Sequence, residues 1–215
     1  MFNNLPTLQD VFIALPGVLM ALTFHEFAHA WVATRFGDDT PRLQGRLTLN
    51  PIAHLDIIGT LLLLIGGFGW AKPVQTNPSR LRPRVWGDIA VSLAGVTMNF
   101  ILAVLFLILG VLGHRYLSPS PYTTVLVKVL LEAFQLNVIL VGFNLLPLPP
   151  LDGFHVIRYL FPRGSEQLVA TLYRWGPMIL ILLFFTNVAD PLLNGIYDAI
   201  FAAIRLIVSP VLGAI

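Results

Sequence analysis

The stretch LTFHEFAHAW, residues 22–31, places two histidines and a glutamate inside an otherwise apolar segment. One ionisable side chain inside a membrane span already costs at least about 2.5 kcal/mol. On a helix, His25 and His29 lie one turn apart and point the same way, so both imidazoles can bind one metal ion. Glu26 lies about 100° around the helix, close enough to act on a water beside the metal. The pattern predicts an HExxH zinc site with Glu26 as its general base.

A metal-free alternative is a polar network that is satisfied between helices. Chance matches to HExxH are rare in a chain with five histidines among 215 residues, which favours the metal site. A tetrahedral catalytic zinc needs a third protein ligand and leaves its fourth position to water. The chain has no cysteine, so the candidates for this third ligand are a carboxylate or one of His54, His114 and His155.

Asp152 is the carboxylate favoured by its context, NLLPLPPLDGFH, at residues 144–155. The prolines there lack backbone N–H groups and break a helix, and Gly153 adds backbone freedom. A broken helix end can direct a carboxylate inward at membrane depth. The alternative is that Asp152 only caps the helix that follows. An HExxH motif that lacks its third ligand favours the metal-binding role.

The composition indicates an integral membrane protein. Hydrophobic residues make up 56% of the chain and charged residues 11%, whereas soluble domains carry roughly 25% charge. The net charge of +2 gives no sign of a nucleic-acid partner. The start MFNNLPTLQD has no basic run and no small-residue cleavage site, so we expect the first apolar segment to remain in the mature protein.

Three apolar segments approach or exceed the roughly 20 residues needed to cross a bilayer. They cover about residues 11–34, 89–113 and 129–151. We expect these spans to form a catalytic core within residues 1–160. One or two further membrane helices are expected within 161–215, where 191–211 either spans or lies at the interface.

Residues 42–70 are expected to form a re-entrant element. The apolar run 54–70 is shortened by glycines, and basic residues flank it on both sides, so both flanks are predicted to be cytoplasmic. This topology puts the N-terminus on the far side and the active site toward the cytoplasm. Leucines alternate in RLQGRLTLN, residues 42–50, which predicts a short strand or hairpin. Such a strand could hold an unwound substrate by edge pairing.

The paired motifs resemble those of the site-2 protease family of intramembrane zinc metalloproteases. HEFAH matches the family's HExxH, NLLPLPPLDG matches its second motif, and AGVTMNF is similar to a pattern on the intervening core helix. The likeness covers about residues 10–160. Val96 departs from the proline that many members have after the glycine, which affects helix geometry rather than metal chemistry. The chain has no PDZ-like insertion, so it resembles the compact form.

The resemblance implies a role for each matching residue. His25, His29 and Asp152 would bind one zinc ion per chain, and Glu26 would be the catalytic base. Supporting roles in positioning the substrate or the core fall to the residues Asn144, Asn99 and His54. For His54, a partner role beside the zinc site and a position facing lipid headgroups are equally favoured.

The sequence thus predicts an all-α polytopic protein of the cell membrane, with a three-helix core and a hairpin or re-entrant element after the first span. The predicted function is hydrolysis of peptide bonds within or near transmembrane helices of membrane-anchored substrates. The alternatives are a zinc-binding membrane transporter or sensor, which would have no use for Glu26, and an inactive relative that serves as a scaffold. Substrate identity and oligomeric state stay open.

Overall fold

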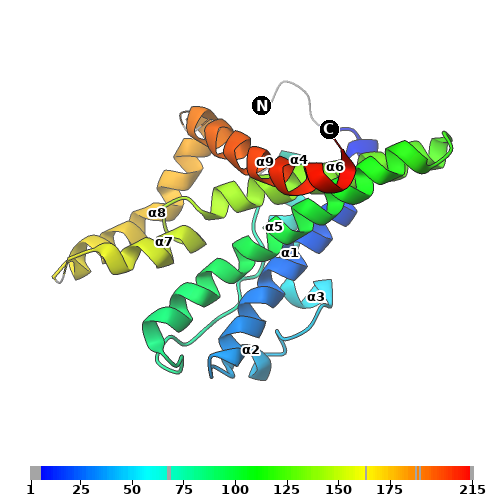
Figure 1. The fold of residues 1–215 in the computed structure, drawn as a ribbon. Coiled ribbons are helices and arrows are strands. Elements are labelled where there is room, and N and C mark those ends of the chain that lie inside the picture. Colours follow the sequence, from blue (N-terminus) through cyan, green and yellow to red (C-terminus); the bar gives the residue numbers. More distant parts are fainter. Residues whose placement is uncertain (1–5, 67–68, 163, 187, 189, 214–215) are drawn as a thin grey trace.

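The computed structural model describes residues 6–66, 69–162, 164–186, 188 and 190–213, and within them the regular secondary structure is almost entirely helical (Figure 1). The helices, in chain order, are α1 (Leu8–Arg35), α2 (Thr40–Leu43), α3 (Pro51–His54), α4 (Ile57–Gly66), α5 (Arg84–Tyr116), α6 (Pro121–Asn144), α7 (Asp152–Ile157), the 3-10 turn η1 (Arg158–Leu160), α8 (Glu166–Thr186) and α9 (Asp190–Leu212).

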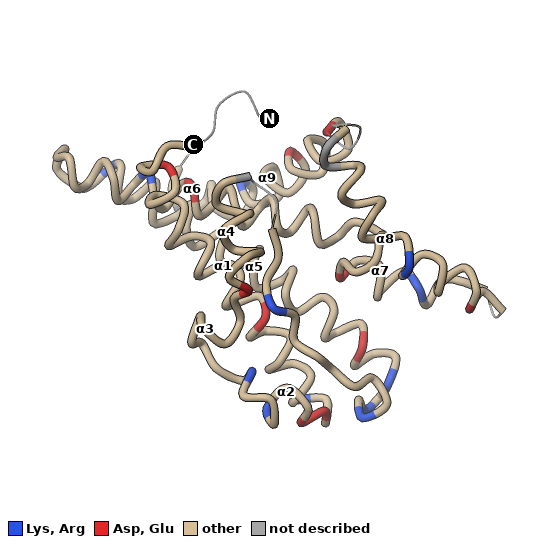
Figure 2. Tube along the Cα trace, turned by 180° about the vertical axis from the view of Figure 1, so that it is seen from behind, with Lys and Arg blue, Asp and Glu red and all other residues tan. Residues whose placement is uncertain are grey.

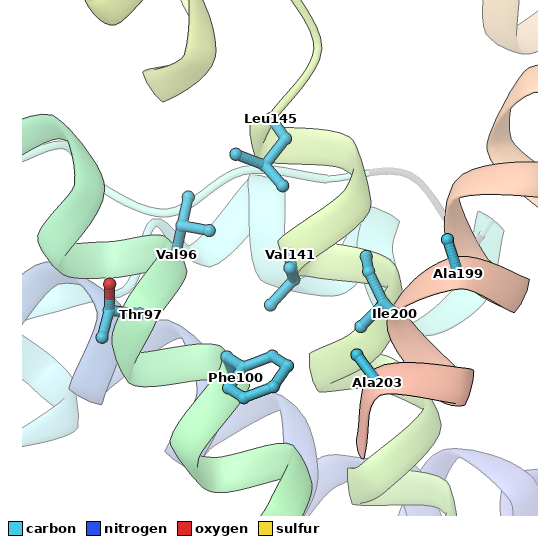
Figure 3. A pocket seen from close by; sticks show the side chains of 8 residues that line it. All are labelled: Val96, Thr97, Phe100, Val141, Leu145, Ala199, Ile200 and Ala203. Carbon is cyan, nitrogen blue, oxygen red and sulfur yellow. The ribbon is translucent and has the colours of Figure 1, made fainter. Parts of the chain in front are cut away.

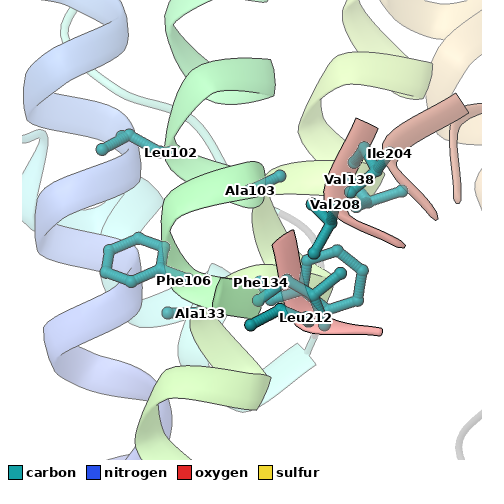
Figure 4. Packing of buried hydrophobic residues seen from close by; sticks show 10 residues of the cluster. Leu102, Ala103, Phe106, Ala133, Phe134, Val138, Ile204, Val208 and Leu212 are labelled. Carbon is teal, nitrogen blue, oxygen red and sulfur yellow. The ribbon is translucent and has the colours of Figure 1, made fainter. Parts of the chain in front are cut away.

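Helices α1, α5 and α6 pack against one another and form the core (Figure 1). A capping box between Thr7 and Asp10 begins α1, and a second one between Ser120 and Thr123 begins α6, so the first N–H groups of both helices have partners. Helix α9 lies across α5 and α6 and adds Ile204 to their apolar cluster (Figure 4). The predicted three-helix core is therefore present, with a C-terminal helix packed against it.

In the part of the chain that the structure describes, four helices are long and apolar enough to cross a membrane, which supports a multi-pass protein. They are Leu8–Arg35, Arg84–Tyr116, Pro121–Asn144 and Asp190–Pro210. Charged residues gather around α2 and the loops beside it, while the long helices carry few (Figure 2). The large apolar side chains exposed on these helices fit contact with lipid rather than water.

The third span ends earlier than the sequence predicts. Helix α6 stops at Asn144 rather than at residue 151. Three prolines follow this point, Pro147, Pro149 and Pro150. They cannot continue the helix, because each lacks an N–H group. The chain turns there and begins α7 at Asp152, which is the broken helix end that the sequence predicted.

The strand predicted at residues 42–50 is wrong: among the described residues, this stretch holds the end of α2 followed by turns. Gly45 has a φ of 68°, in the left-handed region that a strand excludes. Leu43 is 78% exposed, so the leucine alternation does not mark a buried strand face. The segment is instead held by Arg46, whose guanidinium donates to the backbone carbonyls of Ala53 and Lys72.

The two ends of the predicted re-entrant element lie side by side. Helix α4 has ten residues, about 15 Å of rise, which is too short for a hydrocarbon core of about 30 Å. After it, Ala71 forms an antiparallel bridge with Leu55, and the N–H of Lys72 donates to the carbonyl of His54 over 2.9 Å. The β-bridge among the described residues therefore joins Leu55 and Ala71 and does not involve residues 42–50, and it brings the two ends of this element together.

Candidate metal centre

Helix α1 carries both predicted histidines on one buried face. His25 and His29 are separated by one helical turn, and their Nε2 atoms lie 3.0 Å apart. Both rings point toward α5 and α7, where the remaining polar groups of the site converge. The spacing in the sequence is therefore realised as a pair of nitrogens that converge on one point.

Asp152 joins this pair from more than 100 residues away in the chain. Its Oδ2 atom lies 3.4 Å from the Nε2 of His25 and 3.4 Å from that of His29. The same Oδ2 is buried and has no hydrogen-bond partner, although such an atom is costly without one. Among the described residues, these three form a group placed to hold one metal ion.

The donor set fits zinc. Ligand atoms about 2.1 Å from a zinc ion lie roughly 3.4 Å apart at the corners of a tetrahedron. The observed separations of 3.0, 3.4 and 3.4 Å are close to this value. Three protein ligands of this kind leave a fourth position for water or substrate, as catalytic zinc requires.

The far nitrogen of each ring fixes the direction of its ligand atom. The Nδ1 of His25 lies 2.5 Å from the Oδ1 of Asn99, and the Nδ1 of His29 lies 2.7 Å from the backbone carbonyl of Val91. A carbonyl oxygen can only accept, so each Nδ1 carries the proton and each Nε2 presents its lone pair. Both rings are thus held in the tautomer that binds a metal.

Gly95 on α5 leaves room for the rings. A methyl group on this residue would lie 2.5 Å from the Cε1 of His25 and 2.5 Å from the Nε2 of His29. Real side chains do not approach that closely, so any larger residue would displace the two imidazoles. The glycine noted in AGVTMNF therefore serves the metal centre directly.

Glu26 lies beside the group rather than in it. Its Oε2 accepts a hydrogen bond of 2.8 Å from the backbone N–H of Val74, in the segment 71–77 that follows the bridge at Ala71. This carboxylate is buried, as the sequence led us to expect for a base inside the membrane. The contact with Val74 was not predicted, because nothing in the sequence relates residues that lie 48 positions apart.

The other predicted residues have different surroundings. Asn144 ends α6 and donates to the carbonyl of Leu140 over 3.0 Å. His54 is fully buried, which rules out the position facing headgroups, and its Nε2 lies 2.7 Å from the carbonyl of Thr48. Burial lowers the pKa of His54 below its usual value. His155, at the edge of the site, lies 3.4 Å from the hydroxyl of Tyr173.

Comparison with known proteins decides the family. Residues 13–183, most of the chain, match the family described as peptidase family M50. The chain belongs to peptidase family M50. The resemblance to the site-2 proteases, which are part of this family, is thereby confirmed.

Several M50 relatives are similar over most of their length. The putative zinc metalloprotease YwhC of Bacillus subtilis is 42% identical over 202 residues, which cover 91% of this chain and 92% of the relative. The putative zinc metalloprotease Rip2 of Mycolicibacterium smegmatis is 34% identical over 81% of this chain and 67% of the relative. The putative zinc metalloprotease MJ0611 of Methanocaldococcus jannaschii is 32% identical over 68% of this chain and 70% of the relative. No solved structure matches this M50 chain significantly.

These findings confirm the expected class of enzyme, a zinc metalloprotease of family M50, and the expected zinc cofactor. The M50 chain also contains a cavity between its helices. A cavity of about 400 Å³ opens between α5, α6 and α9 (Figure 3). Its wall includes Val96, which follows Gly95, and Leu145, which follows Asn144. The cavity is almost entirely apolar.

Proposed function

We propose that this chain is an intramembrane protease that cleaves peptide bonds within or near transmembrane helices of membrane-anchored proteins. The observation that carries the proposal is the group of His25, His29 and Asp152, in which both histidines are buried among helices long enough to cross a membrane. A hydrolytic site at that depth can reach bonds that soluble proteases cannot.

His25, His29 and Asp152 would hold the zinc ion. When bound, zinc supplies a Lewis acid that makes water acidic near neutral pH and polarises a peptide carbonyl. The fit rests on two lone pairs aimed at one point and on a buried Asp152 oxygen without another partner. This assignment is the same for an active protease and for a zinc transporter, so the distinction rests on Glu26.

Glu26 acts as the general base. Its carboxylate takes a proton from the attacking water, whose oxygen bonds to the carbonyl carbon of the substrate. The same proton then passes from Glu26 to the leaving nitrogen as the C–N bond breaks, so the products are a carboxylic acid and an amine. The hydrogen bond from the Val74 N–H holds one carboxylate oxygen in place, which fixes the orientation of the base.

Asn144 and His54 support the substrate side of the site. The Asn144 amide has two N–H groups, one of which donates to Leu140, and we assign the other to the substrate carbonyl. His54 acts through the chain beside it, because its carbonyl accepts from Lys72 and so holds the segment that carries Val74. Asn99 orients His25, as the hydrogen bond of 2.5 Å between them indicates.

The substrate must expose its backbone before it can be cut. A transmembrane helix hides its carbonyls in internal hydrogen bonds, so substrates should contain residues that weaken a helix near the cut. The apolar cavity between α5, α6 and α9 could accept apolar side chains from such a segment (Figure 3). Basic residues in the loops near α2 favour a cytoplasmic position for this end of the protein. Water would then reach the site from the cytoplasmic side.

The deciding experiment is Glu26→Gln, with Glu132→Gln on α6 as the matched control. Membrane fragments from cells that express each variant are compared by proteomics, and zinc content is measured on each purified protein. Glu26→Gln should lose cleavage by about 10²-fold or more while it keeps zinc, because a general base contributes 10²–10⁴-fold. Glu132→Gln should retain both properties. Unchanged fragments in Glu26→Gln would instead favour a transporter or sensor.

A further inference from the structure

Two buried asparagines link the three core helices to the metal centre. Asn137 on α6 and Asn99 on α5 are both fully buried. The Nδ2 of Asn99 donates to the Oδ1 of Asn137 over 2.8 Å, and the Oδ1 of Asn99 lies 2.5 Å from the Nδ1 of His25 on α1. A continuous chain of hydrogen bonds therefore runs from α6 through α5 to a proposed zinc ligand.

Backbone carbonyls fix the orientation of both amides. The Nδ2 of Asn137 donates to the carbonyl of Ala133 over 2.8 Å, so its Oδ1 must face Asn99. The Nδ2 of Asn99 also donates to the carbonyl of Ala21 over 3.3 Å. Because a carbonyl oxygen can only accept, neither amide can flip without placing its oxygen against another oxygen. Both N–H groups of Asn99 are used, and its Oδ1 is left for His25.

We propose that Asn137 is a positioning residue for the metal centre, which sets the tautomer of His25 through Asn99. With Asn137 as acceptor, Asn99 presents only an oxygen to His25, and the proton of the imidazole must lie on Nδ1. The lone pair of Nε2 then points at the metal position. Without that acceptor, Asn99 is held only by its longer bond to Ala21, and a flipped amide would donate to Nδ1 and move the proton to Nε2.

The surroundings of Asn137 argue against a packing role alone. Its neighbours Phe134 and Val138 belong to the apolar cluster of the core, where Figure 4 shows side chains of α5, α6 and α9 in contact. A polar side chain buried there is costly unless it is fully hydrogen-bonded. Interhelical polar contacts in membranes stabilise only weakly, and a well-packed apolar residue would stabilise the core as much. The contribution of Asn137 beyond packing is therefore the defined orientation of Asn99.

The inference rests on the proposed metal site and is tested without measuring cleavage. The full-length protein is prepared as Asn137→Leu, as Asn137→Asp, and as the control Val138→Ala, which disturbs an equally buried neighbour on α6. Zinc affinity is measured by competition with a chelator of known affinity. The tautomer of His25 in the zinc-free protein is measured by NMR of isotopically labelled histidine.

Asn137→Leu should bind zinc about 10–100-fold more weakly, as expected for loss of a partner behind a metal ligand. Its His25 should populate both tautomers. Asn137→Asp retains an acceptor oxygen and should keep the Nδ1–H tautomer, and Val138→Ala should keep both properties.

Two results would overturn the inference: wild-type affinity and tautomer in Asn137→Leu, or an equal loss of affinity in Val138→Ala. If Asn137→Leu does not fold, the tautomer in Asn137→Asp decides, and a mixed population there would contradict the proposal. The metal site itself is checked on His25→Ala. Zinc bound to that variant with wild-type affinity would remove the proposed site, which is a separate failure from that of Asn137.

Discussion

The backbone N–H of Val74 donates a hydrogen bond of 2.8 Å to the Oε2 of Glu26. This bond joins the segment 71–77 to α1, the helix that carries the HExxH motif. A carboxylate that accepts an N–H bond is held in one orientation. The position of the general base therefore depends on a loop whose sequence carries no catalytic side chain.

Replacement of Val74 by proline removes the donor, because proline has no N–H. Cleavage should fall roughly tenfold or more, since a hydrogen bond to a charged group contributes about 1.5–3 kcal/mol. Zinc content should not change, because no proposed ligand lies in the segment. Val74→Ala is the control, since it keeps the N–H and shortens only the side chain. Equal cleavage by the two variants would show that this N–H is dispensable.

Replacement of Asp152 by alanine should remove most zinc binding. The carboxylate lies 3.4 Å from each imidazole Nε2, so its loss leaves two ligands for the ion. We expect the affinity to fall more than about 100-fold, beyond the 10–100-fold typical of losing a residue behind a ligand. Asp190→Ala is the control, because Asp190 also begins a helix, α9. Full zinc occupancy in purified Asp152→Ala would place the third ligand elsewhere, with His54 the next residue to replace.

A methyl group at Gly95 should also weaken zinc binding, for a steric reason. It would lie 2.5 Å from atoms of both His25 and His29, so the rings or α5 must move. Overpacking of this kind costs about 1–3 kcal/mol, and we expect zinc affinity to fall by about tenfold or more. In Gly195→Ala, the added methyl meets no atom within 4 Å, so zinc binding should stay at the wild-type level. Tight zinc binding by Gly95→Ala would mean that the rings occupy other positions.

Both flanks of the re-entrant element should lie on one side of the membrane. One carboxylate joins them, because Asp38 accepts from the N–H of Thr40 over 3.0 Å and from the N–H of Asn77 over 2.5 Å. The chain has no cysteine of its own, so single cysteines at Thr40 and Thr76 can be labelled cleanly. An impermeant thiol reagent should reach both from the cytoplasmic face. Labelling from opposite faces would make residues 54–70 a true span.

The sequence by itself determined the parts of the site that depend on local geometry. The spacing of His25 and His29 fixes two ligands on one helix face, since the period of an α-helix is independent of the rest of the fold. Prolines after Asn144 end a helix wherever it packs, so the broken end before Asp152 was also predictable. The abundance of apolar residues likewise required a membrane or an equivalent apolar environment.

Only the tertiary structure decided which distant groups complete the centre. The acceptors on Asn99 and Val91, the amide of Asn137 and the N–H of Val74 come from segments brought together by packing, and no local pattern identifies them. The predicted strand at 42–50 failed for the same reason. Its alternation of leucines was a local signal, but Arg46 donates to the carbonyls of Ala53 in α3 and of Lys72, and those contacts outweigh a weak strand preference. Periodicity determines which face a side chain is on, whereas packing determines what it meets there.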